Sequence, residues 1–341
     1  NYTDEELERI FIPKNAFITN ASVGYNQLDI DSSNTLISFE DRMSSKVLSG
    51  FFVNGSLDSL RLIGMASTTY HLFEDSLYKG KNLSSGDTII MRFDEKDLDD
   101  IVVDGGSQGE YVPNKKTNDS DFPLIYSADR IDYFLKTETT KLIGNATAKH
   151  ENTDLKAGFI EVNWPTRILN AFPKQPHDSI NQFIKPTIIE KGRDPMVGNE
   201  MTYNLDTKKG KINYGKTKAD DGFYKGKEIR NESDKTIYIK NSIFTTCDLD
   251  TPHFHFESNK MKIIQDDVVI AKPIILKIAE IPLFGIPLAI FPHQGGRRHS
   301  GWIMPAYGES KSRVQYIDGL GFYWAPNDYR DSKFTLSFGD R

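Results

Sequence analysis

The sequence predicts an all-β fold, and three features of its pattern support that prediction. Short runs rich in β-branched and aromatic residues recur about every 10–15 residues, separated by Gly, Asn, Asp and Ser. Helical periodicity is nearly absent. Several runs alternate apolar and polar residues, as strands with one buried face do. Examples of these runs are 35–39, 59–63, 67–73, 88–93, 141–150, 155–164, 211–216, 236–240, 253–258 and 268–278.

A loose repeat supports a layered arrangement of these strands. Residues 60–66 (LRLIGMA) are similar to residues 141–146 (KLIGNA), and the second copy is followed by 155–162 (LKAGFIEV). A strand, a turn and a returning strand that repeat in this way stack into an elongated sheet in which neighbours supply the core.

The alternating runs in the second half predict an apolar face. In 236–240 the isoleucines share one side of the strand and the terminal lysine takes the other. Such a face forms either a closed core or an open groove, and the pattern alone leaves both open. The residues expected on it are Ile237, Ile239, Phe254, Phe256, Ile274, Leu276 and Ile278.

The composition excludes several classes of protein. The 341 residues are 38% hydrophobic and 26% charged with a net charge of −6, which excludes a disordered chain and gives no nucleic-acid footprint. No apolar run approaches the ~20 residues of a spanning helix. The chain begins with Asn1, so a signal peptide was removed or the sequence is an internal fragment. The strand expected over 333–338 stops without a closing partner, which favours a fragment.

The sequence predicts no enzyme, because motifs for catalysis are missing. It contains no G-x-S-x-G elbow, no P-loop and no H-E-x-x-H, so we expect no catalytic residues and no cofactor. His253 and His255 could share a strand face beside Asp248 or Asp250, but no third ligand has convincing spacing. We therefore expect no metal site.

The stretch 281–331 organises the rest of the chain. Its apolar opening, 281–292, carries Pro282, Pro287 and Pro292, and proline removes a donor from a β-ladder. This segment therefore cannot be a buried central strand, and it is followed by aromatic-rich hairpins. A proline-broken apolar run that leads into aromatic hairpins predicts entry into a membrane as a β-barrel.

The motifs of this stretch resemble the LptD family of outer-membrane lipopolysaccharide-assembly proteins. The resemblance is to the junction where a periplasmic β-domain meets the first barrel strands, and it extends over 196–341. Residues before it resemble only a generic repetitive β-domain of the OstA and LptA group. The matching segments are Pro282, Pro287, 297–301 (RRHSG), Pro305, 321–329 (GFYWAPNDY), 245–248 (TTCD) and 253–256 (HFHF).

The resemblance implies a domain order. Residues 1–164 would form an OstA-like β-domain and 165–195 a proline-rich connection. Residues 196–292 would form an LptD-like β-jellyroll segment, and 293–341 the first strands of a truncated outer-membrane barrel.

The resemblance also implies a function in lipopolysaccharide transport. The apolar face named above would line a groove that shields acyl chains and delivers them to a lateral seam of the barrel. Implied partners are lipopolysaccharide, an LptA-like periplasmic bridge protein and an LptE-like lipoprotein. The implied location is the outer membrane, with the N-terminal domain in the periplasm.

Three further sets of residues gain possible roles from the resemblance. Basic residues at Lys208, Lys209, Lys211, Arg297 and Arg298 are either solvated charge at turns or contacts to headgroup phosphates. Pro305 would weaken strand pairing at the lateral seam. The single cysteine, Cys247, is either a small buried residue or forms a disulfide with a partner outside the chain.

Two other functions fit an all-β chain. The first alternative is an extracellular β-rich adhesion or carbohydrate-binding protein without a transport role. The second is a β-helix polysaccharide hydrolase, for which no pair of carboxylates stands out in the sequence.

Overall fold

The fold is all-β, as the sequence predicts. Every regular element among the described residues is a β-strand, and none of these residues forms a helix that could cross a membrane. The computed structural model describes residues 7–28, 33–74, 76–94, 97–114, 122–174, 183–192, 194–219, 222–233, 235–249, 251–264, 267–292, 300–303, 305–308, 316–327 and 329–339.

The chain divides into two compact units. Unit 1 comprises Asn1–Lys191 with Thr202–Thr207, and unit 2 comprises Gly192–Met201 with Lys208–Arg341. The interval 165–195, expected as a connection, contains two strands, Ile168–Phe172 and Thr187–Glu190, that both pair antiparallel with Thr153–Asn163.

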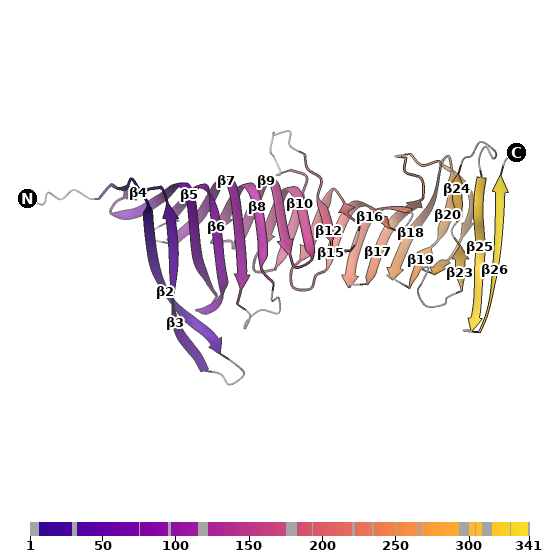
Figure 1. Cartoon of the computed structure of the whole chain (residues 1–341), viewed down its shortest axis with the longest axis horizontal. Coiled ribbons are helices and arrows are strands. Elements are labelled where there is room, and N and C mark those ends of the chain that lie inside the picture. The colour runs from indigo at the N-terminus through magenta and orange to yellow at the C-terminus, as the bar shows by residue number, and fades with distance from the viewer. Residues whose placement is uncertain are drawn as a thin grey trace, which may run out of the picture. The chain divides into compact units, whose positions relative to one another are not determined.

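Unit 1 is a run of antiparallel strands in which chain neighbours pair. From β4 to β10 each strand pairs with the next (Figure 1), and the β2–β3 hairpin joins this run through β5. The strands are β1 (Arg9–Ile12), β2 (Ala16–Leu28), β3 (Ser33–Ser45), β4 (Val47–Val53), β5 (Ser56–Glu74), β6 (Leu77–Asp94), β7 (Asp97–Pro113), β8 (Leu124–Phe134), β9 (Thr139–His150), β10 (Thr153–Asn163), β11 (Ile168–Phe172), β12 (Thr187–Glu190) and, at the division between units, β14 (Glu200–Asn204).

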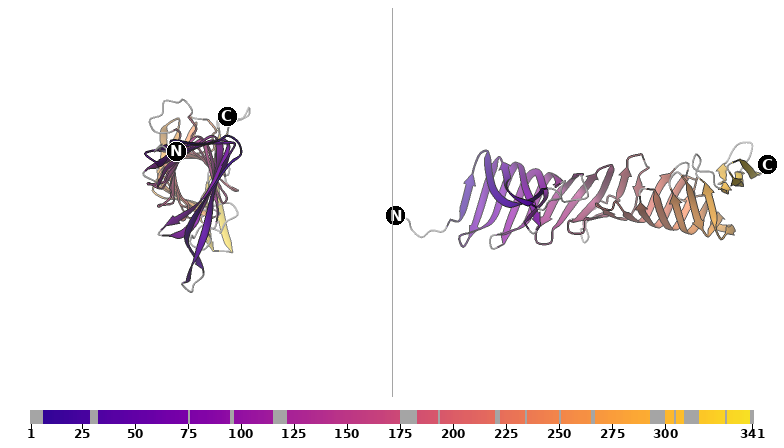
Figure 2. Two further views of the ribbon diagram at one scale, coloured as in Figure 1. Left: turned by 90° about the vertical axis from the view of Figure 1, so that its left-hand side faces the viewer. Right: turned by 90° about the horizontal axis from the view of Figure 1, so that it is seen from below.

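Strands β5 to β9 of unit 1 bend at a corner. Pairing shifts register between Ile63 and Ala66 in β5, and the corner backbone is left-handed at Gly64 and Gly144, with φ of 81° and 74°. Glycine is favoured at such φ because it has no Cβ. Both copies of the Ile-Gly-x-Ala repeat therefore lie on corners. As a result, the two halves of each strand lie in two facing layers (Figure 2).

One layer of unit 1 buries a row of large aliphatic side chains. The row runs in register across six neighbouring strands, and each member is fully shielded from solvent. Burial of one such side chain contributes about 1.5–3 kcal/mol to stability. The members are Leu62, Ile89, Val103, Ile131, Leu142 and Ile160.

A buried polar network links the two layers of unit 1. The Asn82 amide donates to the Tyr126 hydroxyl at 2.8 Å, and Ser84 lies 2.8 Å from the Tyr133 hydroxyl. The two tyrosine hydroxyls lie 3.2 Å apart. Burial raises the pKa of Tyr133 to about 12, so its hydroxyl stays protonated and can donate.

Unit 2 repeats the antiparallel pattern with shorter strands. Strands β15 to β18 pair in sequence, while β18 pairs with β19 along one half and with β20 along the other. The strands are β13 (Met196–Val197), β15 (Gly210–Ala219), β16 (Gly222–Ser233), β17 (Thr236–Thr245), β18 (Phe254–Ile264), β19 (Val268–Lys272), β20 (Ile274–Ile278), β21 (Ile281–Ile286) and β22 (Ala289–Pro292).

Corners also occur in unit 2, where two successive residues face outward. In β17, Ile239 and Ser242 are buried while Lys240 and Asn241 between them are exposed. The inward face therefore shifts by one residue at each corner. The outward pairs are Asn213–Tyr214, Lys227–Glu228, Lys240–Asn241 and Asn259–Lys260.

A separate four-stranded antiparallel sheet follows. Strand β25 (Tyr316–Asn327) pairs with β23 (Gly301–Ile303), with β24 (Ala306–Gly308) and with β26 (Arg330–Gly339). The β25–β26 turn is fixed by the Asn327 side chain, whose oxygen accepts from the backbone N–H of Tyr329 and of Arg330 at 3.0 and 2.9 Å.

Candidate functional site

The interior of unit 2 is the candidate site, because it contains the apolar residues expected to line a groove. Ile239, Phe254, Phe256, Ile274 and Leu276 are buried. The remaining two, Ile237 and Ile278, are half-buried.

The two halves of each strand divide these residues between them. On β18, Phe254 and Phe256 pair in register with Ile278 and Leu276 of β20. On β17, Ile239 lies before the corner and pairs with Met261. The expected groove residues therefore belong to both layers of the unit rather than to one continuous face.

Simple alternation along a strand does not predict several of the interior residues, because the inward face shifts at each corner. Phe244 lies five positions after Ile239, an odd spacing that places it on the opposite face of a straight strand. Its ring nevertheless lies 4.7 Å from that of Tyr224 and 6.4 Å from that of Phe256, measured between centroids. The signal for this shift of the inward face is a pair of successive outward-facing residues, Lys240 and Asn241. Other buried residues of unit 2 that simple alternation does not predict include Ile212, Ile229, Met261, Val268, Ala271 and Ala289.

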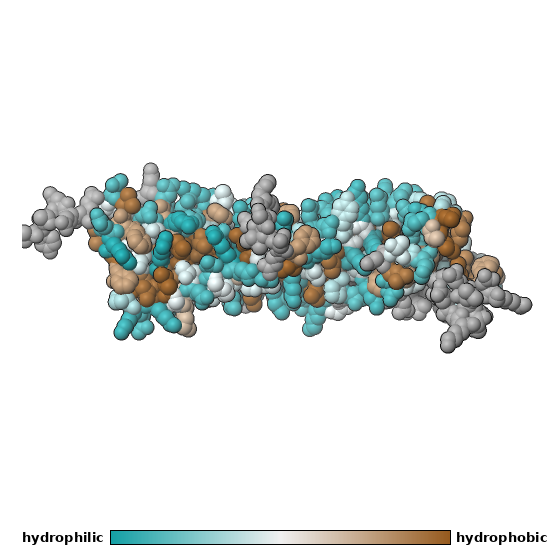
Figure 3. Space-filling model, turned by 90° about the horizontal axis from the view of Figure 1, so that it is seen from above, coloured by the Kyte–Doolittle hydropathy of each residue, from teal (hydrophilic) through white to brown (hydrophobic). Residues whose placement is uncertain are grey.

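This interior offers dispersion contacts and very few hydrogen-bonding groups. Among the described residues, most side chains that are buried in unit 2 are aliphatic or aromatic, and the buried polar ones are Ser242, Thr245, His255 and Ser258. Such an environment favours alkyl chains over sugars or charged groups. On the face shown in Figure 3, hydrophobic side chains gather in patches between broadly hydrophilic margins.

The lysines expected to contact a headgroup lie on the outside, and two of them face carboxylates. Lys209 Nζ is 3.4 Å from Glu232, and Lys211 Nζ is 3.4 Å from Glu228. Lys208 is exposed, with a left-handed φ of 55°. Arg297 and Arg298 lie outside the described residues.

Glu228 is the centre of this charged cluster. Its Oε1 lies 2.8 Å from Lys240 Nζ and 2.8 Å from Arg230 Nε. The hydrogen bond from Lys240 is the largest of the effects that lower the pKa of Glu228 to about 2. Much of the basic charge near the corner is thus balanced within the protein.

Comparison with known proteins identifies the C-terminal part of the chain. Residues 269–340 match the family model described as LptD protein. This stretch, which we term the LptD-family segment, is similar to that family. It begins inside β19 and extends through β26, so it includes part of the apolar interior of unit 2.

Comparison with solved structures finds several similar chains. The chain is similar to the crystal structure of LptH, the LptA-homologous periplasmic component of the lipopolysaccharide transport device from Pseudomonas aeruginosa. The identity is 14% and the TM-score 0.36, over 44% of this chain and 94% of that one. No curated protein sequence matches the chain.

The LptD-family segment exposes a strongly apolar strand. In β21, Ile281 is 63% exposed and Leu283 is 57% exposed. This strand pairs antiparallel with β20. Proline at 282 and 287 limits further pairing of this strand. Strand β26 likewise presents Phe334 and Leu336 to solvent.

Two single residues with expected roles are also placed. Pro305 is buried between β23 and β24. Cys247 is a half-buried free thiol whose Sγ lies 3.9 Å from His253 Nδ1. The described residues contain no group of three potential metal ligands, and His253 is exposed whereas His255 is buried.

Proposed function

We propose that this protein is a non-enzymatic carrier that shields the acyl chains of lipopolysaccharide and delivers the lipid to the outer membrane. The observation that carries the proposal is the position of the LptD-family segment. It supplies Ala271, Ile274 and Leu276 to the same apolar interior that β15–β18 build. The family segment and the interior are therefore one structural unit.

The acyl chains would enter between the two layers of unit 2. Transfer of one methylene from water to an apolar interior gains about 0.8 kcal/mol, so about ten methylenes would gain about 8 kcal/mol before the cost of parting the layers. The residues that would line this path are Ile237, Ile239, Phe254, Phe256, Ile274, Leu276 and Ile278, with Phe244 and Met261 as additional members.

The domain order follows from this path. An N-terminal OstA-like, LptA-like jellyroll domain would face the periplasm and receive lipid from an LptA-like bridge protein. The sheet β23–β26 would contribute the first strands of an outer-membrane barrel that an LptE-like lipoprotein accompanies. Supporting this, Phe334, Leu336 and Phe338 alternate along β26 and are all exposed, as expected of a lipid-facing strand.

The remaining expected roles attach to this path. Lys208, Lys209, Lys211, Arg297 and Arg298 would contact headgroup phosphates. Lys209 and Lys211 would exchange a carboxylate for a phosphate on doing so. Pro305 would keep the lateral seam weakly paired. Cys247 would form a disulfide with a cysteine outside this chain.

Filling the interior tests the proposal. Leu276→Trp adds a large side chain at a position that is 3% exposed, and Ile281→Trp adds the same side chain at one that is 63% exposed. We expect Leu276→Trp to weaken binding of radiolabelled lipopolysaccharide by about tenfold or more, and Ile281→Trp to leave it unchanged. Equal binding by both folded variants would refute an interior path.

A further inference from the structure

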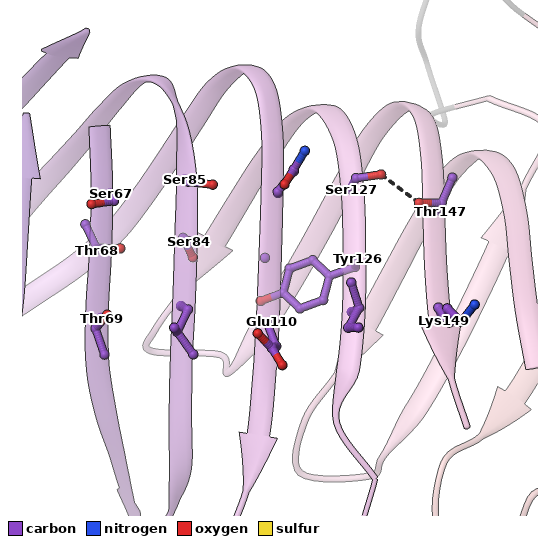
Figure 4. Close-up of a pocket in the computed structure, with 14 residues that line it drawn as sticks. Ser67, Thr68, Thr69, Ser84, Ser85, Glu110, Tyr126, Ser127, Thr147 and Lys149 are labelled. Atoms are coloured by element: carbon purple, nitrogen blue, oxygen red, sulfur yellow. Dashed lines mark hydrogen bonds between the residues drawn. The ribbon is translucent and has the colours of Figure 1, made fainter. Parts of the chain in front are cut away.

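A groove with a row of hydroxyl and amide side chains crosses the solvent face of unit 1, away from the apolar interior. It spans β5 to β9 and has a volume of about 680 Å³ (Figure 4). Ser85, Gln108 and Ser127 lie on the outward face of the sheet, where they alternate with buried residues. Two of these buried residues, Ser84 and Tyr126, also line the groove. The groove is therefore distinct from the proposed acyl path.

Strand register aligns hydroxyl and amide groups along this groove. Ser67 pairs with Ser85, Ser85 with Gln108, Gln108 with Ser127, and Ser127 with Thr147. Neighbouring strands lie about 4.8 Å apart, so the row repeats at that interval. Figure 4 shows Ser67, Ser85, Ser127 and Thr147 at about one level across the strands.

The row is rigid and retains hydrogen-bonding capacity. Ser127 and Thr147 share one hydrogen bond, with 2.7 Å between their oxygens, and Ser67 shares one with Ser44, at 2.8 Å. A hydroxyl has one donor and two acceptor positions, and an amide offers both kinds of group, so each member can bond to a further partner. The buried network around Tyr126 lies directly beneath the row and fixes its backbone.

The charge and shape of the groove select a class of ligand. Lys149, one of the two charged residues that line it, lies 3.6 Å from Asp154, and the other is Glu110. The groove therefore has no excess positive charge for a nucleic acid or a polyphosphate. Strands β6, β7 and β8 are paired on both sides, so an added peptide strand has no free edge there.

We infer that this groove binds the saccharide portion of lipopolysaccharide through the row Ser67, Ser85, Gln108, Ser127 and Thr147. A sugar chain presents hydroxyl donors and acceptors at an interval close to that of neighbouring strands, so successive rings can each reach one member of the row. The assignment of the sugar to lipopolysaccharide rests on the proposed function, whereas the saccharide chemistry rests on the groove alone.

Binding of a delipidated saccharide tests the inference. The probe is the oligosaccharide released from lipopolysaccharide by mild acid, titrated against the purified chain by calorimetry. The double variant Gln108→Leu/Thr147→Val removes the hydrogen-bonding groups of two row members. We expect its affinity for the oligosaccharide to fall by about tenfold or more. The matched control, Thr139→Val, lies on β9 outside the groove and should bind normally.

If the double variant does not fold, NMR of the unaltered protein tests the same inference. In the unaltered protein, amide shifts on adding the oligosaccharide should concentrate on β5–β9 of unit 1. Shifts elsewhere, no binding, or equal affinity for dextran would overturn the inference. Binding of lipid A without binding of the oligosaccharide would also overturn it while leaving the proposed acyl path intact.

Discussion

Removal of one buried hydroxyl should destabilise unit 1 well beyond the cost of an ordinary surface change. In Tyr126→Phe the Asn82 side chain, which is 2% exposed, loses both of its bonds to Tyr126, at 2.8 and 3.0 Å. Asn82 keeps its hydrogen bonds to Ser84 and Tyr70, so we expect the loss of the two bonds to Tyr126 to cost about 1–3 kcal/mol.

The assay is hydrogen exchange of β6–β8 amides, because two units need not unfold in one transition. Tyr238→Phe, at a position that is 42% exposed in unit 2, is the control and should change exchange very little. A single variant within 0.5 kcal/mol of the unaltered protein would refute the role given to this network.

Two other predictions concern unit 2. Because the pKa of Glu228 is lowered from its ordinary value of 4.5 to about 2, its ion cluster stabilises the fold above pH 4.5, and this contribution is lost as pH falls toward 2. Glu228→Gln should therefore reduce the acid dependence of the melting temperature between those values; an unchanged profile would contradict the cluster's role. Pro305→Ala supplies a missing ladder donor and should slow delivery of lipopolysaccharide to the cell surface by the full-length protein. Exposed Pro326→Ala in the same sheet is its control, and unaltered delivery with Pro305→Ala would contradict a weak seam.

The strand pattern of this fold can be read from the sequence, but its corners cannot be placed in the same way. The runs 59–63 and 67–73 were separated at Gly64 and Met65, whereas both belong to the single strand β5. The left-handed residues that looked like a turn between strands make a corner inside one. The Ile-Gly-x-Ala repeat was therefore visible, while its structural meaning required the register of the neighbouring strands.

The candidate site was partly predictable for the same reason. Alternation within half a strand identified Phe254 and Phe256, but the phase shift at the corner hid Phe244. The ion pairs of the basic cluster could not be predicted for a different reason. That Lys211 faces Glu228 depends on pairing between β15 and β16, which residue spacing along one strand does not reveal.

Photo-cross-linking of lipopolysaccharide tests the central claim most directly. A benzophenone amino acid would replace Phe256, which is 5% exposed in the interior, and in a second variant Tyr238 on the outer face. The account predicts a cross-link to the acyl chains from position 256 and none from position 238. Cross-links from position 238 alone, or from neither position while lipid binds, would contradict it.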